Sequence, residues 1–244
     1  MTQETTRPVA LVTGSTSGIG LAIAQRLAAE GWRVALNSAR SAEAGEKLAA
    51  ELPDALYVRA DLTGEGEPER LVEAVTAAFG QLDLLVNNAG RTARVAHADL
   101  AGAPLELWRE IFELNVFANW AATVAAVPWL RAVRGAVVNI TSIAGERPAG
   151  SSVPYAVSKA AVAHLTRLLA ASLGPEVRVN AVAPGLIDTP WTAGMTDIRA
   201  YVEAATPLRR VGTPQDVADA VLALVNSRYT TGEVLLADGG AHLI

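Results

Sequence analysis

Three side chains in the second half of the sequence have the chemistry needed to move a proton. Tyr155 and Lys159 are four positions apart, and Ser142 precedes Tyr155 by thirteen positions. On a helix, positions i and i+4 share a face, so the phenol and the ammonium would be neighbours. A nearby cation favours the phenolate, and we expect it to lower the pKa of Tyr155 from about 10 toward neutrality. Such a tyrosine could exchange a proton with a hydroxyl or carbonyl oxygen, although Tyr-x-x-x-Lys alone also fits an exposed helix face.

A glycine-rich stretch near the N-terminus could bind phosphate. It reads Thr13-Gly14-Ser15-Thr16-Ser17-Gly18-Ile19-Gly20 and follows a short apolar run. Glycines allow the backbone to approach a ligand closely, and the N-terminus of the next helix would offer free N–H groups to a pyrophosphate. The spacing G-x-x-x-G-x-G differs from the commoner G-x-G-x-x-G. A tight turn that needs positive φ would also explain these glycines.

Polar residues follow the later apolar runs as well. A dinucleotide site often has an acidic residue after the second run, or a basic one for a 2′-phosphate, and Asn37–Arg40 offers only Arg40. The alternative for Arg40 is a solvated side chain at a helix start. Asp61 could accept a hydrogen bond from an adenine amino group or merely cap a turn at Thr63. Asn87-Asn88-Ala89-Gly90 spells a turn, unless its backbone also passes beside a flat ligand.

Alternating strands and helices must position these residues. The expected strands are Val9–Val12, Arg33–Leu36, Ala55–Val58, Leu82–Val86, Ala136–Ile140, Val177–Val182 and Glu233–Ala237. The expected helices are Ile19–Glu30, Ala42–Glu51, Glu67–Phe79, Leu105–Ala126, Tyr155–Leu173 and Pro214–Val225, with left-handed caps at Gly31, Gly80 and Gly174. Near-continuous apolar strands predict a parallel sheet covered on both faces. We therefore expect one α/β domain over residues 1–244, doubly wound and of Rossmann type, with about seven strands and ligands at their carboxyl ends.

Composition narrows the possible functions. The chain has 244 residues, 51% of them hydrophobic and 18% charged, with a formal net charge of −5 and no cysteine. The absence of cysteine excludes disulfides, thiol catalysis and thiolate zinc sites, and we expect no metal. The negative charge argues against nucleic acid as a partner. The polar N-terminus and the lack of a long apolar run predict a cytoplasmic protein with no membrane partner.

Taken in order and spacing, these motifs closely resemble those of the short-chain dehydrogenase/reductase family. The resemblance covers essentially the whole chain, from the glycine-rich stretch to Thr231-Gly-Glu-Val-Leu-Leu-Ala-Asp-Gly-Gly240. It includes Asn87-Asn-Ala-Gly90, Asn115 within Leu114-Asn-Val, Ser142, Tyr155-Ala-Val-Ser-Lys159, and Pro184-Gly185 with Thr189.

The resemblance implies an NAD(P)-dependent oxidoreductase that transfers a hydride between nicotinamide and a small carbonyl or alcohol substrate. Tyr155 would be the general acid or base, and Lys159 would lower its pKa and hold the nicotinamide ribose. Ser142 would hydrogen-bond the substrate oxygen, and Asn115 would anchor a proton-relaying water. The backbone of Ile187 and the hydroxyl of Thr189 would hold the carboxamide. The expected cofactor-binding residues are Gly14, Ser15, Ser17, Gly18, Ile19, Gly20, Ser38, Arg40, Asp61, Leu62, Asn88, Ala89, Gly90, Tyr155, Lys159, Pro184, Gly185, Ile187 and Thr189.

Arg40, with no acidic residue beside it, favours NADP(H) as the cofactor over NAD(H). Within the family, the sequence looks most like the 3-oxoacyl-carrier-protein reductases. Those enzymes carry basic residues just past the catalytic helix, whereas Ala171–Arg178 has little clustered positive charge. Arg131 and Arg134 remain as candidate docking cations for an acyl carrier protein. A nucleotide-binding module without chemistry is a further alternative.

Two expectations concern substrate and assembly. Arg91–Asp99, Ala144–Pro154 and Pro190–Pro207 should form the substrate pocket, with Trp191 and Met195 as apolar candidates and a lid at about 190–207. The helices at Leu105–Ala126 and Tyr155–Leu173 carry apolar residues on more than one face. One face would pack on the sheet and another on a copy of the chain. Since similar family members assemble in this way about two axes, we expect a homotetramer with 222 symmetry, with a dimer as the alternative.

Overall fold

Seven parallel strands form one sheet in the computed structural model, which describes residues 7–244. Their order across the sheet is β3-β2-β1-β4-β5-β6-β7. The strands are β1 Val9–Val12, β2 Arg33–Ser38, β3 Leu56–Arg59, β4 Leu84–Asn87, β5 Ala136–Ile140, β6 Arg178–Pro184 and β7 Val234–Ala237. This order is that of a Rossmann-type doubly wound fold, so the predicted fold class is confirmed. The polar N-terminal stretch 1–6 lies outside the described residues.

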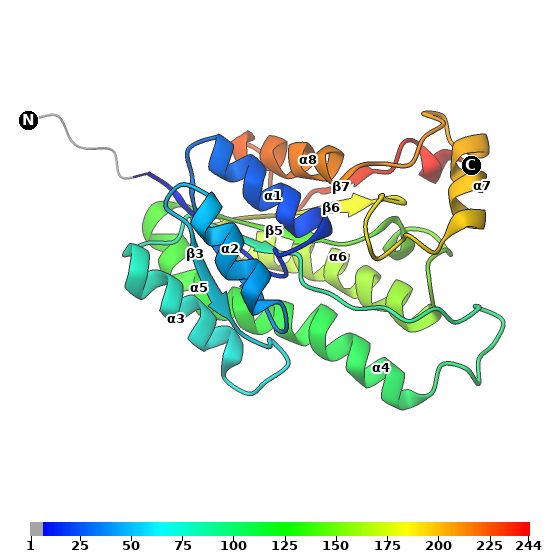
Figure 1. Ribbon diagram of the computed structural model, residues 1–244, viewed down its shortest axis with the longest axis horizontal. Coiled ribbons are helices and arrows are strands. Elements are labelled where there is room, and N and C mark those ends of the chain that lie inside the picture. Colours follow the sequence, from blue (N-terminus) through cyan, green and yellow to red (C-terminus); the bar gives the residue numbers. More distant parts are fainter. Residues whose placement is uncertain (1–6) are drawn as a thin grey trace, which may run out of the picture.

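Helices cover both faces of the sheet (Figure 1). They are α1 Gly18–Ala29, α2 Ala42–Glu51, α3 Glu67–Phe79, α4 Leu105–Phe112, α5 Ala118–Val133, α6 Val153–Leu173, α7 Thr196–Ala205 and α8 Pro214–Asn226. Alternate residues of β1 enter different cores: Ala10 and Val12 pack with α1 and α8, whereas Val9 and Leu11 pack with α3 and α5. A strand buried on both faces must be apolar throughout, which explains the continuous run in the sequence.

The register of β1 sets the position of the site. Val12 pairs with Leu36 of β2 on one side and with Val86 of β4 on the other. The next two strands in the sequence, β2 and β3, lie on one side of β1, whereas β4 and the later strands lie on its other side. The loops after β1 and β4 therefore diverge to opposite faces and leave a crevice at the carboxyl ends, where such folds bind ligands.

Several element boundaries differ from those expected. The single helix predicted at Leu105–Ala126 is α4 and α5 joined by a π-helical turn, η1 (Glu113–Phe117), and it continues to Val133. Helix α7 was not predicted. The left-handed cap is present at Gly31 and Gly80, with φ of 85° and 74°, but the one predicted at Gly174 is wrong because its φ is −66°. Pro175 follows Gly174, and a residue before proline prefers extended backbone.

One helical stretch in the described residues, Leu105–Val133, is long and apolar enough to cross a membrane by length and composition. In this fold one side of the α5 part of this stretch packs on the sheet and on α3. Ala118, Ala122, Ala126 and Leu130 recur every four positions and are buried against strands and α3. Much of its opposite face is exposed, including Phe117, at 54%, and Trp120, at 48%.

Candidate active site

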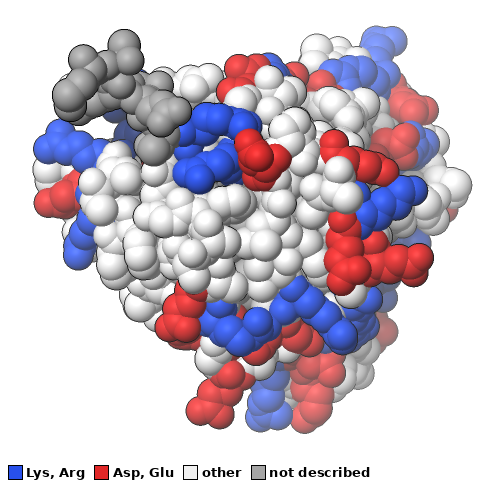
Figure 2. Space-filling model, turned by 60° about the vertical axis from the view of Figure 1, so that its left-hand side comes forward, with Lys and Arg blue, Asp and Glu red and all other residues white. Residues whose placement is uncertain are grey.

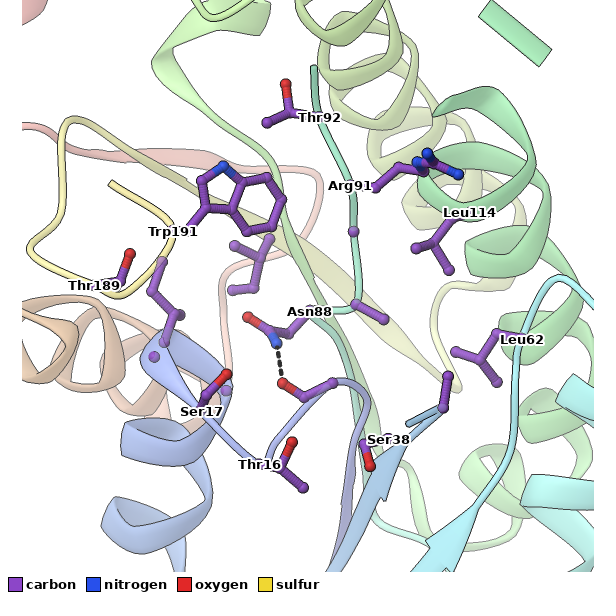
Figure 3. A pocket seen from close by; sticks show the side chains of 18 of the residues that line it. Thr16, Ser17, Ser38, Leu62, Asn88, Arg91, Thr92, Leu114, Thr189 and Trp191 are labelled. Carbon is purple, nitrogen blue, oxygen red and sulfur yellow. Dashed lines mark hydrogen bonds between the residues drawn. The ribbon is translucent and has the colours of Figure 1, made fainter. Parts of the chain in front are cut away.

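A cavity of about 700 Å³ opens at the carboxyl ends of the central strands (Figure 3). Its walls come from the loops after β1, β2, β3, β4, β5 and β6. Of the residues expected to bind a cofactor, the following line it: Gly14, Ser17, Gly18, Ile19, Gly20, Ser38, Arg40, Asp61, Leu62, Asn88, Ala89, Gly90, Tyr155, Lys159, Pro184, Gly185, Ile187 and Thr189. The remaining one, Ser15, is fully buried and does not line the cavity. Sequence reasoning assigned no binding role to Thr16, Thr63 and Leu114, which also line it, whereas Thr92 and Thr192, which line it too, lie in segments expected to form the substrate pocket.

The glycine-rich loop combines tight turns with a close approach. Gly14 and Gly18 have φ of 61° and 54°, which only glycine adopts readily. A Cβ at Gly20 would lie 2.4 Å from both the side-chain nitrogen of Asn88 and the carbonyl oxygen of Gly14. That Asn88 nitrogen donates to Gly14 O at 3.0 Å and to Thr13 O at 2.9 Å (Figure 3). Backbone conformation and close packing within the loop therefore explain why these positions are glycine. The loop that they form also borders the cavity.

The N-terminus of α1 has the chemistry of an anion site. Its N-cap, Ser17, makes no side-chain hydrogen bond to the helix. The first N–H groups of the helix are therefore left for another acceptor at the cavity wall, where the helix dipole is positive. No acidic residue lies in the first turn of α1. This combination fits the pyrophosphate of a dinucleotide.

Asn37 holds the glycine-rich loop against the neighbouring strand. Its side-chain oxygen accepts from Gly14 N at 3.3 Å, and its side-chain nitrogen donates to Val58 O at 3.2 Å and Ala60 O at 3.1 Å. Its backbone N–H donates to the hydroxyl of Ser15 at 3.0 Å, which explains why Ser15 faces away from the cavity. Asn37 was not assigned a role from sequence, because only the folded chain shows these partners.

The end of the cavity beyond β2 and β3 is polar. The backbone N–H and the hydroxyl of Thr63 both donate to Asp61 Oδ1, at 3.2 and 2.8 Å. Asp61 therefore caps the turn at Thr63, as one of its two interpretations proposed, and it also lines the cavity. Arg40 is exposed at the same end. Strand β2 extends two residues further than predicted, so Ser38 is its last residue and is buried.

Ser142, Tyr155 and Lys159 meet at the other end of the cavity. Ser142 lies two residues after the end of β5, and its hydroxyl oxygen accepts a hydrogen bond from Ala144 N at 3.2 Å. Helix α6 begins at Val153, which places Tyr155 in its first turn and Lys159 one turn later. The Lys159 amine donates to Ile140 O at 2.8 Å and lies 5.7 Å from the centre of the Tyr155 ring.

The two titratable groups shift in directions set by burial. Burial raises the pKa of Tyr155 above its ordinary value, and a hydrogen bond with Ser142 opposes that rise. Burial lowers the pKa of Lys159 to about 8. The expected lowering of the pKa of Tyr155 by Lys159 is wrong for this structure. The amine is hydrogen-bonded to the Ile140 carbonyl and lies near the ring face, and burial of the phenol sets the direction of its pKa shift.

Asn115 joins the loop after β4 to helix α6. It lies in η1, is 2% exposed and does not line the cavity. Its side chain accepts from Arg91 N at 2.8 Å and donates to Arg91 O at 3.1 Å and to the hydroxyl of Ser158 at 2.9 Å. That hydroxyl donates to Tyr155 O at 2.7 Å. The side chain of Asn115 thus fixes the backbone on both sides of the cavity end that holds Tyr155.

The expected substrate-binding segments contribute unequally. Trp191 lines the cavity, and Figure 3 shows its indole at the same end as Thr92 and Arg91. Met195 is buried and does not line it. Within the described residues, nothing from Ala144–Pro154 lines it either, although Ser151 O accepts from Val95 N at 2.9 Å and supports the opposite segment.

Comparison with known proteins places these features in context. Residues 14–242 match the family model described as Enoyl-(Acyl carrier protein) reductase. The chain is 63% identical over 97% of its length, and 97% of the relative's, to "Granaticin polyketide synthase putative ketoacyl reductase 2" of Streptomyces violaceoruber. It is 38% identical, over 95% of each chain, to cis-4-hydroxycyclohexanecarboxylate dehydrogenase of Sinomonas cyclohexanicum. A solved variant of a Serratia marcescens short-chain dehydrogenase/reductase matches with a TM-score of 0.88 and 32% identity, covering 96% of this chain and 97% of that one.

Proposed function

Since the chain belongs to the short-chain dehydrogenase/reductase family and is an oxidoreductase of that family, we propose that it is an NADP(H)-dependent ketoreductase. One observation carries this proposal. Ser142, Tyr155 and Lys159 line the same cavity as the glycine-rich loop and the uncapped end of α1. A dinucleotide with its pyrophosphate at α1 would extend along this cavity toward these three side chains. The nicotinamide, when bound, supplies or accepts the hydride.

Tyr155 is suited to act as a general acid. Burial raises its pKa, so its hydroxyl carries a proton at neutral pH and can donate it to the oxygen of a carbonyl substrate. The Ser142 hydroxyl would hydrogen-bond the same oxygen and hold it near the phenol. The ammonium of Lys159 would then stabilise the phenolate that remains. The protonated phenol is the form that can act in the reductive direction, in which the substrate becomes an alcohol.

We propose a ketoacyl intermediate of polyketide type as the substrate. The relative with 63% identity carries that activity in its name, and the match covers nearly the full length of both chains. The indole of Trp191 and the side chain of Leu114 would give the ketone an apolar surface near the acid. Arg131 and Arg134 do not support docking of a carrier protein there. Arg131 lies in the last turn of α5, and Arg134 directly follows this helix, just before β5 begins. Both arginines are therefore at the amino edge of the sheet, whereas the cavity opens at the carboxyl edge.

Consumption of NADPH tests this proposal. The purified protein would be given NADPH with a 3-ketoacyl thioester of a small thiol or with the same acyl group on a carrier protein, and, in a separate assay, NADP⁺ with cis-4-hydroxycyclohexanecarboxylate. We expect reduction of the ketoacyl thioester, with kcat/KM that does not depend on the carrier protein. Oxidation of cis-4-hydroxycyclohexanecarboxylate in the absence of ketoacyl reduction would contradict the substrate and point to the activity named for the other relative.

For the cofactor, we propose NADP(H). The charged or hydroxyl-bearing side chains at the end of β2 include those of Ser38 and Arg40, and no carboxylate follows β2 in residues 38–41 to repel a 2′-phosphate. An arginine can meet that phosphate with paired N–H donors. The same role for Arg40 was the sequence-based expectation.

We also propose a lid and a homotetramer. Helix α7, within the proposed lid at about 190–207, has no buried residue, so little packing opposes its movement. Exposed apolar side chains on the outer face of α5, including Trp120, Val124 and Trp129, support a contact with a second copy of the chain. Figure 2 shows a broad area without Lys, Arg, Asp or Glu on one side of the molecule, bordered by charged side chains.

A further inference from the structure

A buried serine stands in helix α6 between Tyr155 and Lys159. The side chain of Ser158 is fully buried, whereas that of Val157, directly before it, is 42% exposed. Serine is a poorer helix former than alanine, because its hydroxyl competes for backbone hydrogen bonds. A buried hydroxyl in a helix therefore needs partners, and Ser158 has two.

The two hydrogen bonds of the Ser158 hydroxyl each have one possible donor. Its proton is donated to Tyr155 O at 2.7 Å, because a carbonyl oxygen can only accept. Its oxygen then accepts from the side-chain nitrogen of Asn115 at 2.9 Å. Arg91 fixes the orientation of that amide, since Arg91 N can only donate to the amide oxygen, at 2.8 Å, and Arg91 O can only accept from the nitrogen, at 3.1 Å.

These hydrogen bonds join three segments of the chain at one end of the cavity. Arg91 follows β4 and lines the cavity, Asn115 lies in η1, and Tyr155 lies in the first turn of α6. The backbone N–H of Tyr155 also donates to the hydroxyl of Ser152, at 3.4 Å. Side chains of Ser152 and Ser158 therefore hold both backbone polar groups of Tyr155, and Ser158 connects one of them to a different element.

A second serine of α6 shows what a purely local role looks like. Ser172 donates to Leu168 O at 2.8 Å and is exposed. A bond to the preceding helical turn is a common way for a helical serine to use its hydroxyl. Ser158 makes such a bond too, but it also accepts from Asn115, and the carbonyl to which it donates belongs to the proposed acid.

We propose that Ser158 is a positioning residue for proton donation, because it connects the loop after β4, through Asn115, to the backbone of Tyr155. This inference rests on the proposed role of Tyr155 as the general acid. Without the Ser158 hydroxyl, one N–H of the Asn115 amide loses its partner and the first turn of α6 loses this link to η1. Tyr155 lies in that turn, and a small displacement of a reacting group lowers the rate strongly.

Steady-state kinetics of three single variants test this role. The variants are Ser158→Ala, Ser158→Thr and, as the matched control on the same helix, Ser172→Ala. We expect Ser158→Ala to lower kcat for the ketoacyl thioester about tenfold, with KM and the dissociation constant for NADPH within about twofold of the wild type. Ser172→Ala should change none of these values.

Ser158→Thr should restore most of the lost kcat, because it keeps the hydroxyl. Threonine already makes the equivalent bond at another buried position of α6, where Thr166 donates to Val162 O at 2.8 Å. Melting temperatures of all variants report folding separately from kinetics. If Ser158→Ala does not fold, Ser158→Cys keeps the size with only a weak donor and should also lower kcat.

A double variant tests whether Ser158 acts through its link to Asn115. In an Asn115→Ala background, Ser158→Ala should lower kcat by less than about twofold further, because the link is already broken. Additive losses would contradict the link.

Three other results would overturn the inference. They are a kcat within about twofold of the wild type in Ser158→Ala, an equal loss in a folded Ser158→Thr, and a rise in KM or in the NADPH dissociation constant as large as the fall in kcat. The wild type is a separate result. A wild type that does not reduce the ketoacyl thioester contradicts the proposed function, whereas an active wild type with an equally active Ser158→Ala contradicts the role of Ser158 alone.

Discussion

The amine of Lys159 lies 5.7 Å from the centre of the Tyr155 ring and is hydrogen-bonded to a backbone carbonyl rather than to the phenol oxygen. The lysine is 6% exposed, so its charge has lost most of its hydration. Its pKa falls for that reason, and the pKa of Tyr155 rises for the same reason. The pair thus holds a protonated phenol beside an ammonium that can accommodate a phenolate once a proton has left.

The lowered pKa of Lys159 predicts a specific dependence of stability on pH. Its pKa is about 8 in the folded chain against an ordinary 10.5. Between these values the unfolded chain binds a proton that the folded chain does not, so stability rises with pH. From about pH 7 to about pH 9.5, the free energy of unfolding of the wild type should gain about 2 kcal/mol relative to Lys159→Met. Urea denaturation of both proteins measures this difference, and parallel pH profiles would contradict it.

Removal of the phenolic oxygen should abolish proton donation and spare cofactor binding. Tyr155→Phe should reduce kcat by roughly two orders of magnitude or more, the usual scale of acid–base catalysis. The dissociation constant for NADPH should stay within about twofold. Steady-state kinetics and calorimetry measure the two effects, with Tyr229→Phe as the control. Turnover within about threefold of the wild type would show that another group supplies the proton.

Arg40 should discriminate between the two cofactors. Arg40→Ala removes the paired donors proposed for the 2′-phosphate and should weaken NADPH binding about tenfold while leaving NADH nearly unchanged. Arg131→Ala, at the opposite edge of the sheet, is the matched control and should change neither. Equal losses for NADPH and NADH in Arg40→Ala would mean that the arginine is only a solvated helix residue.

Asn37 should matter for folding because three backbone groups, two of them in buried hydrogen bonds, depend on its side chain. Asn37→Ala leaves Gly14 N, Val58 O and Ala60 O without that partner. Unpaired buried polar groups are costly, so we expect a loss of about 2 kcal/mol in the free energy of unfolding. Urea denaturation measures it, and the exposed Asn226→Ala serves as the control. A stability equal to that of the control would show that water replaces the side chain.

The exposed apolar face of α5 predicts the assembly. Light scattering at micromolar concentration should give about four times the chain mass of 25.4 kDa. Trp120→Glu should shift the mass to smaller species, because a charge cannot be buried at an apolar contact without large cost. Leu100→Glu, on an exposed loop, should not. A wild-type mass near 25.4 kDa would contradict a second buried face.

Local sequence patterns predicted most of the scaffold. The continuous apolar run Val9–Val12 predicted a strand buried on both faces, and the cores on either side of β1 bear this out. Gly31 and Gly80 marked helix ends because only glycine readily adopts their positive φ. Such signals depend on neighbouring residues along the chain, and they can be read without knowing the fold.

The tertiary structure decided which polar atoms meet and how buried they are. Tyr57 and Ser38 are nineteen positions apart, and their hydroxyls meet only because β2 and β3 pair in one register. The pKa values of Tyr155 and Lys159 depend on burial by loops that surround the cavity, so their spacing alone predicted the wrong direction for the tyrosine. Residue type and spacing determine which chemistry is available. Desolvation and long-range hydrogen bonds, which exist only in the folded chain, determine the protonation state in which each group works.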